Sequence, residues 1–308
     1  MVKNPRHRPE GLATRGTTAP NRLRRVDRWI VANMAHMLRS SERPPLVVDL
    51  GFGASPVTAV ELYERLRQVR PDVKVIGLEI DAARVEVGTR FLAALDLPGD
   101  YGGLSFALGG FELPVPRPPL LVRAFNVLRQ YDEEEAWRAW DKLCSRLAPG
   151  GVLVEGTSDE MGRRAVWVTL SRIDETDAPL SAGKKAGRPG PSLTAEARTI
   201  TFAARVSALP CPSELAERLP KTLIHNNIPG KRIHQFLVDF DRAWAITAPQ
   251  SVFGPRQRWI AAVEHLCLSW PVITHPPAGG RARWRLGEVT LPWTAVAPCK
   301  EVRSRHSS

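Results

Sequence analysis

The chain has 308 residues, with 43 Lys and Arg against 32 Asp and Glu, for a formal net charge of +11. This length allows one large domain with additions, or two domains, and in either case a sizeable buried core. No apolar run reaches the length of about 18 residues that spans a bilayer, and the N-terminal residues lack the apolar segment of a signal peptide. We therefore expect a cytoplasmic protein without a membrane partner.

The four cysteines show no pattern of a metal site or of a disulfide framework. None has a second cysteine at Cys-x-x-Cys spacing or a histidine at zinc-ligand spacing. We therefore expect free thiols in a reducing compartment and no bound metal. These residues are Cys144, Cys211, Cys267 and Cys299.

The positive charge lies at the two ends of the sequence. Residues 1–45 carry 10 basic and 3 acidic side chains, residues 46–178 carry 15 and 21, and residues 179–308 carry 18 and 8. Basic flanks are typical of proteins that bind nucleic acid. However, 35 of the basic residues are Arg and only 8 are Lys, which a GC-rich genome also explains. Both interpretations stay open.

The chain begins with residues that favour an irregular arm and then a helix. Residues 1–20 are rich in Arg, Pro, Gly and Thr and have no apolar period, so we expect a flexible arm. Apolar residues then recur every three or four positions, which predicts an N-terminal helical segment over residues 21–45.

Strands and helices then alternate in the segment that we take as the main domain, residues 46–210. Short apolar runs predict strands at 46–48, 73–78, 104–107, 120–125 and 152–155. Amphipathic stretches predict helices at 57–69, 82–95 and 132–147. Such alternation is typical of the α/β class, with a doubly wound, mostly parallel sheet and right-handed crossovers.

The alternation stops after this point. Two β-rich segments, 165–173 and 198–207, have no long helix between them, and we expect an antiparallel strand pair at the end of the sheet. The Gly, Pro and Lys residues between them predict a flexible basic loop at 178–192. Residues 211–308 read as a largely helical, basic C-terminal extension, with helices at 231–246 and 255–270.

A hairpin that turns at Gly287 is expected at 281–293, near the end of this extension. Its first strand would place Arg281, Arg283 and Arg285 on one face. Such a row fits a phosphate-tracking surface. It fits equally a solvated edge strand protected by charge.

The loop from Asp49 to Gly53, which includes Gly51 and Phe52, follows the first predicted strand. Glycines at this point let a ligand lie against the backbone. A dinucleotide loop has a third glycine at the start of the helix, where this chain has Pro56. Asp49 stands two places before the first glycine, and its carboxylate would repel a pyrophosphate but attract an ammonium group. The loop therefore favours a ligand with a cationic, amino-acid-like end.

These residues resemble the first motif of class I S-adenosylmethionine-dependent methyltransferases, acidic-x-Gly-x-Gly. Glu79, at the end of the second strand, matches the acid that holds the ribose hydroxyls in this family, and Ile80 would then flank the adenine. The Gly110-Phe111 pair stands where the family has an adenine contact, which here would come from backbone. Leu147-Ala148-Pro149-Gly150-Gly151 is similar to the turn before the family's fifth strand. The resemblance implies a Rossmann-like fold and S-adenosylmethionine as cofactor.

The resemblance also implies that residues after the fourth strand face the transferred methyl group. Asn126, Arg129 and Tyr131 are therefore our catalytic candidates, and Asn126 also borders the cofactor. Methyltransferases that act on base amines carry Asn/Asp-Pro-Pro-Tyr/Phe here, and only Asn126 matches. RNA and a small metabolite both remain open as acceptors. Two other functions also remain: a non-catalytic nucleotide- or RNA-binding module of this fold, and a dinucleotide-dependent oxidoreductase.

Overall fold

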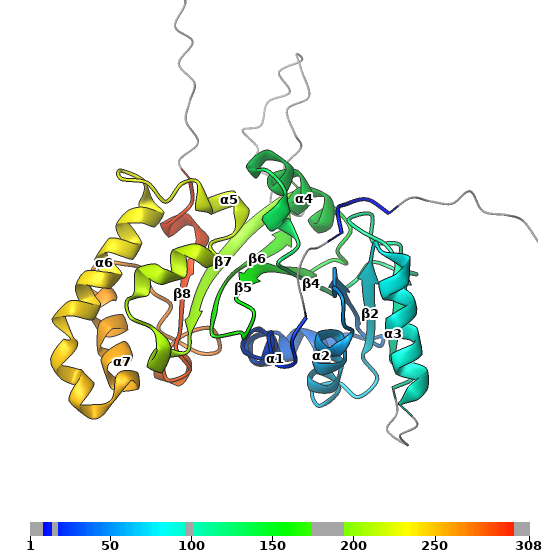
Figure 1. Ribbon diagram of the computed structural model, residues 1–308, viewed down its shortest axis with the longest axis horizontal. Helices are drawn as coiled ribbons and strands as arrows, with labels where there is room; N and C mark the ends of the chain where they lie inside the picture. The colour runs from blue at the N-terminus through cyan, green and yellow to red at the C-terminus, as the bar shows by residue number, and fades with distance from the viewer. Residues whose placement is uncertain (1–8, 14–17, 96–100, 174–193, 299–308) are drawn as a thin grey trace, which may run out of the picture.

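All strands of the computed structural model belong to one sheet (Figure 1). The structure describes residues 9–13, 18–95, 101–173 and 194–298. Within these ranges the sheet has eight strands in the order β3-β2-β1-β4-β5-β6-β7-β8. The strands are β1 (Leu46–Leu50), β2 (Lys74–Glu79), β3 (Leu104–Leu108), β4 (Leu121–Phe125), β5 (Val152–Ser158), β6 (Arg164–Arg172), β7 (Ala195–Ala204) and β8 (Glu288–Pro292).

The sheet has a parallel half and an antiparallel half. β1 to β5 all pair in parallel, with β1 between β2 and β4. β6 pairs antiparallel with β5, β7 with β6, and β8 with β7. The parallel order β3-β2-β1-β4-β5 confirms the predicted doubly wound, Rossmann-like class, and the antiparallel pairing of the two later segments is also confirmed.

Helices cover both faces of the sheet. The α-helices are α1 (Arg24–Ser40), α2 (Val57–Arg67), α3 (Ala82–Ala94), α4 (Glu133–Ser145), α5 (Lys221–Ile224), α6 (Arg232–Ile246), α7 (Pro255–Leu266) and α8 (Arg281–Trp284). Short 3-10 turns are η1 (Leu128–Gln130), η2 (Val206–Ala208), η3 (Pro212–Arg218), η4 (Ala248–Phe253) and η5 (Trp293–Ala295). In Figure 1, α1 and α2 lie below the sheet and α4 above it.

Alternating strand residues divide the core into two layers. Val47 and Leu121 point to the layer between the sheet and helices α1 and α2. Val48 and Val122 point to the opposite layer, which includes residues of α4, α6 and α7. This alternation follows from the pleat of a strand, which turns successive side chains to opposite faces. Central strands buried on both faces are the reason that their sequences are continuous apolar runs.

The ends of the helices follow from local side chains. Asp132 and Glu135 form a capping box at the start of α4, in which each carboxylate accepts a backbone N–H of the other residue. Asp81 caps α3 by accepting from the backbone N–H of Ala83. Gly150, with φ +70°, forms the turn that leads from α4 into β5.

The C-terminal part differs from the sequence expectation in one element. The predicted hairpin at 281–293 is wrong, because its first half is the single-turn helix α8 and its second half, β8, pairs with β7. The three arginines therefore do not form one row: Arg283 is buried beside Glu288, while Arg281 pairs with Glu264. The predicted basic loop at 178–192 lies outside the described residues.

None of the helices in the described ranges combines the length and apolarity needed to cross a membrane.

Glu155 is a buried carboxyl in the middle of the sheet, on β5. Its side chain is 2% exposed, and its Oε2 accepts a hydrogen bond from Trp140 Nε1 at 3.2 Å. Burial raises its pKa from about 4.5 to about 8, although the Trp140 hydrogen bond opposes this shift. The folded protein therefore keeps this carboxyl protonated at pH values at which the unfolded chain ionises it.

We expect this difference to make the protein less stable as pH rises. Between about pH 5 and pH 7.5, Glu155 is ionised in the unfolded chain and protonated in the folded protein. The free energy of unfolding therefore falls by of order 1 kcal/mol for each pH unit of increase. The Glu155→Gln variant lacks this contribution. Urea unfolding of both proteins across this pH range measures it, and parallel pH profiles would contradict the assignment.

Candidate functional site

The carboxyl ends of β1, β2 and β4 meet at the point where the strand order reverses. In a doubly wound sheet this switch point is where ligands bind. Gly51 and Gly53 form the loop after β1 with φ of +70° and +82°, values that favour glycine. The loop N–H of Gly51 donates to the carbonyl of Leu78, at the end of β2, at 2.8 Å. We call this place the sheet-edge cleft.

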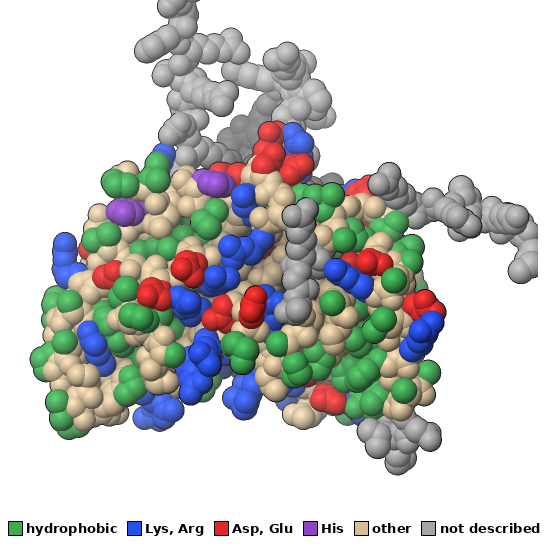
Figure 2. All heavy atoms as spheres, in the orientation of Figure 1, with side chains coloured by type: hydrophobic (Ala, Val, Ile, Leu, Met, Phe, Trp, Pro, Cys, Tyr) green, Lys and Arg blue, Asp and Glu red, His purple; other side chains and the backbone are tan. Residues whose placement is uncertain are grey.

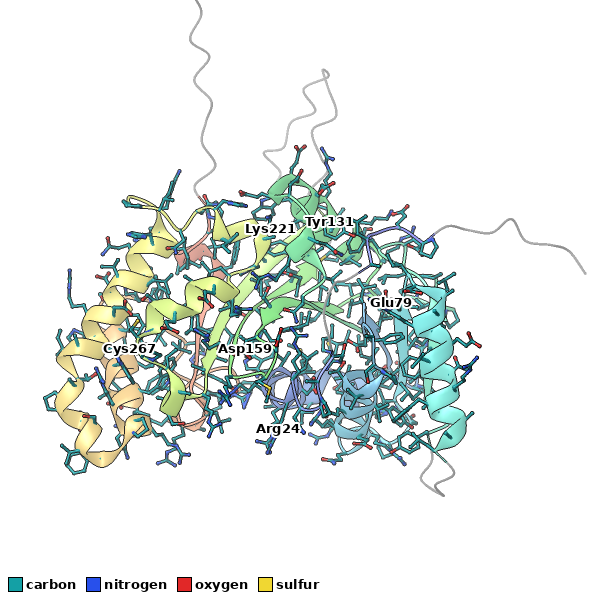
Figure 3. The ribbon with its side chains drawn as sticks, viewed as in Figure 1. Arg24, Glu79, Tyr131, Asp159, Lys221 and Cys267 are labelled. Atoms are coloured by element: carbon teal, nitrogen blue, oxygen red, sulfur yellow. The ribbon has the colours of Figure 1, made fainter. Side chains whose placement is uncertain are left out.

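Glu79, the last residue of β2, fixes the loop from the side. Its carboxylate is 1% exposed and accepts from the backbone N–H of Gly53 at 2.9 Å and from that of Ile80 at 3.0 Å. The guanidinium of Arg84 lies 3.6 Å away. Glu79 and Tyr131, both labelled in Figure 3, line the same cavity. The carboxyl group of Glu79 is thus held at the wall of the cleft by two backbone hydrogen bonds.

Five of the nine predicted cofactor residues line the cleft, and four do not. The lining residues are Gly51, Glu79, Ile80, Gly110 and Phe111. Tyr131, one of the catalytic candidates, lines it as well. The four that do not line it are Asp49, Phe52, Gly53 and Asn126. Phe52 is 3% exposed and packs edge to face on Phe106 at 4.9 Å, which makes it a core residue.

Asp49 points away from the cleft, into a buried ion network below the sheet. The strand register places it directly beside Arg123 on β4, and both carboxylate oxygens accept from this guanidinium at 2.9 and 2.8 Å. Arg123 also binds Asp27 of α1 and donates to the carbonyl of Thr58. Asp27 in turn accepts from Arg65 at 2.8 Å.

Within this network, both carboxylate oxygens of Asp49 are bound to Arg123. Arg123 and Asp27 are both 0% exposed and Asp49 is 3% exposed. Burial alone lowers the pKa of Arg123, but Asp27 and Asp49 outweigh this effect and raise it above its usual value. The guanidinium therefore stays charged. Asp49 is neutralised by it and holds β1 to β4, which leaves it unsuited as a counter-charge for a ligand's ammonium group.

The cleft itself is filled by a segment from the start of the chain, residues 9–13. The carbonyl of Glu10 accepts from the N–H of Phe111 at 3.0 Å, and the N–H of Glu10 donates to Glu112 at 2.9 Å. Leu12 donates its N–H to the hydroxyl of Tyr131 and accepts from Gln130 at 2.7 Å. Figure 1 shows this dark-blue segment above the sheet, near β4.

The fit between the 9–13 segment and the cleft is close. A Cβ on Gly110 would lie 1.9 Å from the carbonyl oxygen of Glu10. Gly11, with φ +136°, leaves 3.1 Å between a Cβ and the Tyr131 hydroxyl. The remaining cavity is about 20 Å³, whereas pockets for cofactor-sized molecules have roughly 300 Å³ or more.

The three catalytic candidates lie at different places. Asn126, with φ +61°, accepts from the N–H of Ser158 at 3.0 Å and so links the ends of β4 and β5. Tyr131 packs on Phe111 with ring centroids 5.4 Å apart, and burial raises the pKa of its phenol. Arg129 donates to the carbonyl of Glu217 at 3.2 Å and does not line the cleft. The structure therefore brings only Tyr131 to the cleft wall.

Sequence reasoning missed the two features that close the site, the Arg123 network and the 9–13 segment. An arginine inside the apolar run of β4 was the available signal for the first, because a buried charge requires a partner. The second had no signal in residue type. No group of three or more potential metal ligands occurs in the described parts of the chain.

Comparison with known proteins adds a likeness in fold. No protein-family model matches the chain, and no curated protein matches it. Similar solved structures include a mitomycin 7-O-methyltransferase (16% identity, 44% of this chain and 35% of that chain, TM-score 0.33) and a glycopeptide N-methyltransferase (17%, 39% and 50%, TM-score 0.31). A cyclopropane synthase from Mycobacterium tuberculosis also matches (15%, 49% and 44%, TM-score 0.31).

The matched region spans between a third and a half of these solved proteins. At such identities the likeness concerns the fold alone. The Rossmann-like class that the family resemblance implied is confirmed by the sheet itself, through its strand order and parallel register.

Removing the central cation of the ion network tests its role. We expect Arg123→Met to lower the free energy of unfolding by roughly 3–5 kcal/mol, because Asp49 loses its partner and remains buried. The triple variant Asp27→Asn, Asp49→Asn, Arg123→Met, which buries no unpaired carboxylate in this network, should recover most of the loss. Urea unfolding at neutral pH measures both. A single variant as stable as the natural chain would contradict the assignment.

Proposed function

We propose that this chain is an S-adenosylmethionine-dependent methyltransferase and that the sheet-edge cleft binds the cofactor. The observation that carries the proposal is Glu79, a buried carboxylate at the end of β2 that lines the cleft beside Gly51 and Gly110. A carboxylate at this place suits the two hydroxyls of a ribose, because it accepts strong charge-assisted hydrogen bonds.

Five of the lining residues have a role in this proposal. Glu79 would hold the ribose, Ile80 and Phe111 would enclose the adenine, and the backbone of Gly51 would border the amino-acid end. Bound S-adenosylmethionine supplies the electrophilic methyl group. Tyr131 would position the acceptor and exclude water. Asp49 would act indirectly, by holding β1 against β4 through Arg123.

The cofactor fits only when the 9–13 segment leaves the cleft. The present cavity of about 20 Å³ is too small, and the hydrogen bonds that retain the segment come mainly from its backbone groups. We therefore propose two states of the cleft, one filled by Glu10 to Leu12 and one open to the cofactor. The apparent affinity for the cofactor is then reduced by the fraction of molecules in the filled state.

A second candidate function is a non-catalytic binding module of the same fold. The observation that favours it is the filled cleft, because a cleft permanently occupied by its own chain would need no cofactor. Cofactor binding separates the two candidates. Isothermal titration of the full chain with S-adenosylhomocysteine should show binding, and no binding even to a variant with a destabilised 9–13 segment would favour the module. Binding of NAD alone would indicate an oxidoreductase.

The role of Glu79 predicts a loss of cofactor affinity on neutralisation. We expect Glu79→Gln to weaken S-adenosylhomocysteine binding by roughly 10- to 100-fold, since hydrogen bonds to a charged group contribute about 1.5–3 kcal/mol. Glu155→Gln is the control for replacing a buried strand carboxyl with an amide, because Glu155 is also buried at a strand position but does not line the cleft. Unchanged titration curves for a folded Glu79→Gln protein would remove this residue from the site.

The two-state cleft predicts a gain of affinity when the 9–13 segment is strained. Gly11→Val places a β-branched residue at φ +136°, at a cost of roughly 1–3 kcal/mol to the filled state, so S-adenosylhomocysteine should bind about tenfold more tightly. Gly230→Val is the control, with φ +87° and open space around it. An equal affinity of both variants and the natural chain would argue against displacement of the segment.

A further inference from the structure

A second hollow borders the antiparallel half of the sheet and shares no lining residue with the sheet-edge cleft. It consists of two neighbouring cavities of about 570 and 400 Å³ that share the lining residues Met161, Arg163 and Arg205. Its walls come from α1, the turn between β5 and β6, the segment after β7, the start of α7 and the end of α8. None of its residues lines the cleft. We call it the arginine groove.

Among the residues that the structure describes, nine arginines and no lysine line the arginine groove. They are Arg24, Arg25, Arg28, Arg163, Arg164, Arg205, Arg218, Arg256 and Arg285. Figure 2 shows blue side chains running from the centre of the view to its lower edge, and Figure 3 labels Asp159 and Arg24 along the same path. Segments far apart in sequence thus contribute one type of side chain to one surface.

Most of this charge is not compensated within the described part of the protein. Six of the nine arginines are exposed and form no ion pair with a described residue: Arg24, Arg28, Arg163, Arg205, Arg256 and Arg285. Arg164 and Arg218, by contrast, pair with Glu214 and Glu217. Like charges around one hollow raise the potential there and attract anions.

The acidic residues of the groove do not cancel this potential. Asp159 accepts from the backbone N–H groups of Arg163 and Arg164 at 2.7 and 3.1 Å. Its carboxylate thus stabilises the turn between β5 and β6. Glu288 is 1% exposed beside Arg283, below the groove surface. Glu160 is the third. Three lining carboxylates, together with Glu214 and Glu217 beside Arg164 and Arg218, are thus outnumbered by nine guanidinium groups.

The number and kind of these groups indicate the ligand. Guanidinium groups bind phosphate oxygens in a bidentate fork, and arginine is the preferred residue for this contact. A single phosphate engages only a few of them, whereas nine along one open groove suit a chain of phosphates. None of the described residues that line the groove is aromatic, so these residues offer no platform for base stacking.

We propose that the arginine groove binds the phosphodiester backbone of a nucleic acid without reading its sequence. The inference stands apart from the proposed methyl transfer, since the groove and the cleft share no residue. Hydrogen bonds nevertheless link the groove residue Asp159 to the end of β4. Arg22 donates to the hydroxyl and carbonyl oxygens of Ser158 and to the carbonyl of Asp159, and Ser158 donates its N–H to Asn126. A bound strand would therefore pass near the end of β4.

Fluorescence anisotropy with the full chain and no cofactor tests the groove. The probes are labelled single-stranded RNA and DNA of the same mixed sequence, titrated at salt concentrations between about 50 and 200 mM. We expect binding that weakens steeply with salt. Tighter binding of RNA would show that the ribose hydroxyl takes part in recognition, and equal binding would show that the phosphates alone are recognised. Both results support the proposal.

Charge removal within the groove makes the test specific. The triple variant Arg24→Gln, Arg163→Gln, Arg205→Gln should bind at least tenfold more weakly at low salt and have a log–log salt slope smaller by about 2. The control removes three exposed arginines elsewhere, Arg90, Arg138 and Arg198, and should retain the natural affinity within about twofold. No binding by the natural chain, a flat salt dependence, or equal losses in both variants would overturn the proposal.

Discussion

The buried guanidinium of Arg123 is the interaction on which both surfaces of this protein depend. It joins β4 to β1 through Asp49 and the sheet to α1 through Asp27. The first contact holds the strand from which the glycine loop of the sheet-edge cleft emerges. The second fixes the helix whose first turns carry Arg24, Arg25 and Arg28 into the arginine groove. A charge inside the fold thus positions residues on two separate faces.

The parallel half of the fold could be predicted from sequence because its patterns are local. Apolar runs such as Leu46 to Val48 give strands, and their order along the chain gives the doubly wound sheet. The position of Glu79 at a strand end followed in the same way. The hairpin expected at 281–293 was wrong. Three arginines at every second position are compatible with an alternating strand and also with a single-turn helix, so this pattern could not decide between them.

The candidate site could be predicted only in part, because its closing contacts are not local. The pairing of Asp49 with Arg123 depends on strand register across 74 residues. The 9–13 segment binds mainly through its own N–H and C=O groups, which every residue type except proline offers alike. Neither contact has a signature in residue periodicity. The same segment shows that an arm without an apolar period still finds a place in the fold when its backbone groups meet matching partners.

In the proposed function, the sheet-edge cleft releases the 9–13 segment when it binds S-adenosylmethionine. Amide hydrogen exchange can be measured by mass spectrometry with and without S-adenosylhomocysteine. It reports at once on the release of the segment and on the binding of the ligand. We predict that the ligand speeds exchange at Glu10 and Leu12, whose N–H groups lose Glu112 and Tyr131, and slows it at Gly51 and Ile80. Unchanged exchange at all four amides under saturating ligand would contradict the claim.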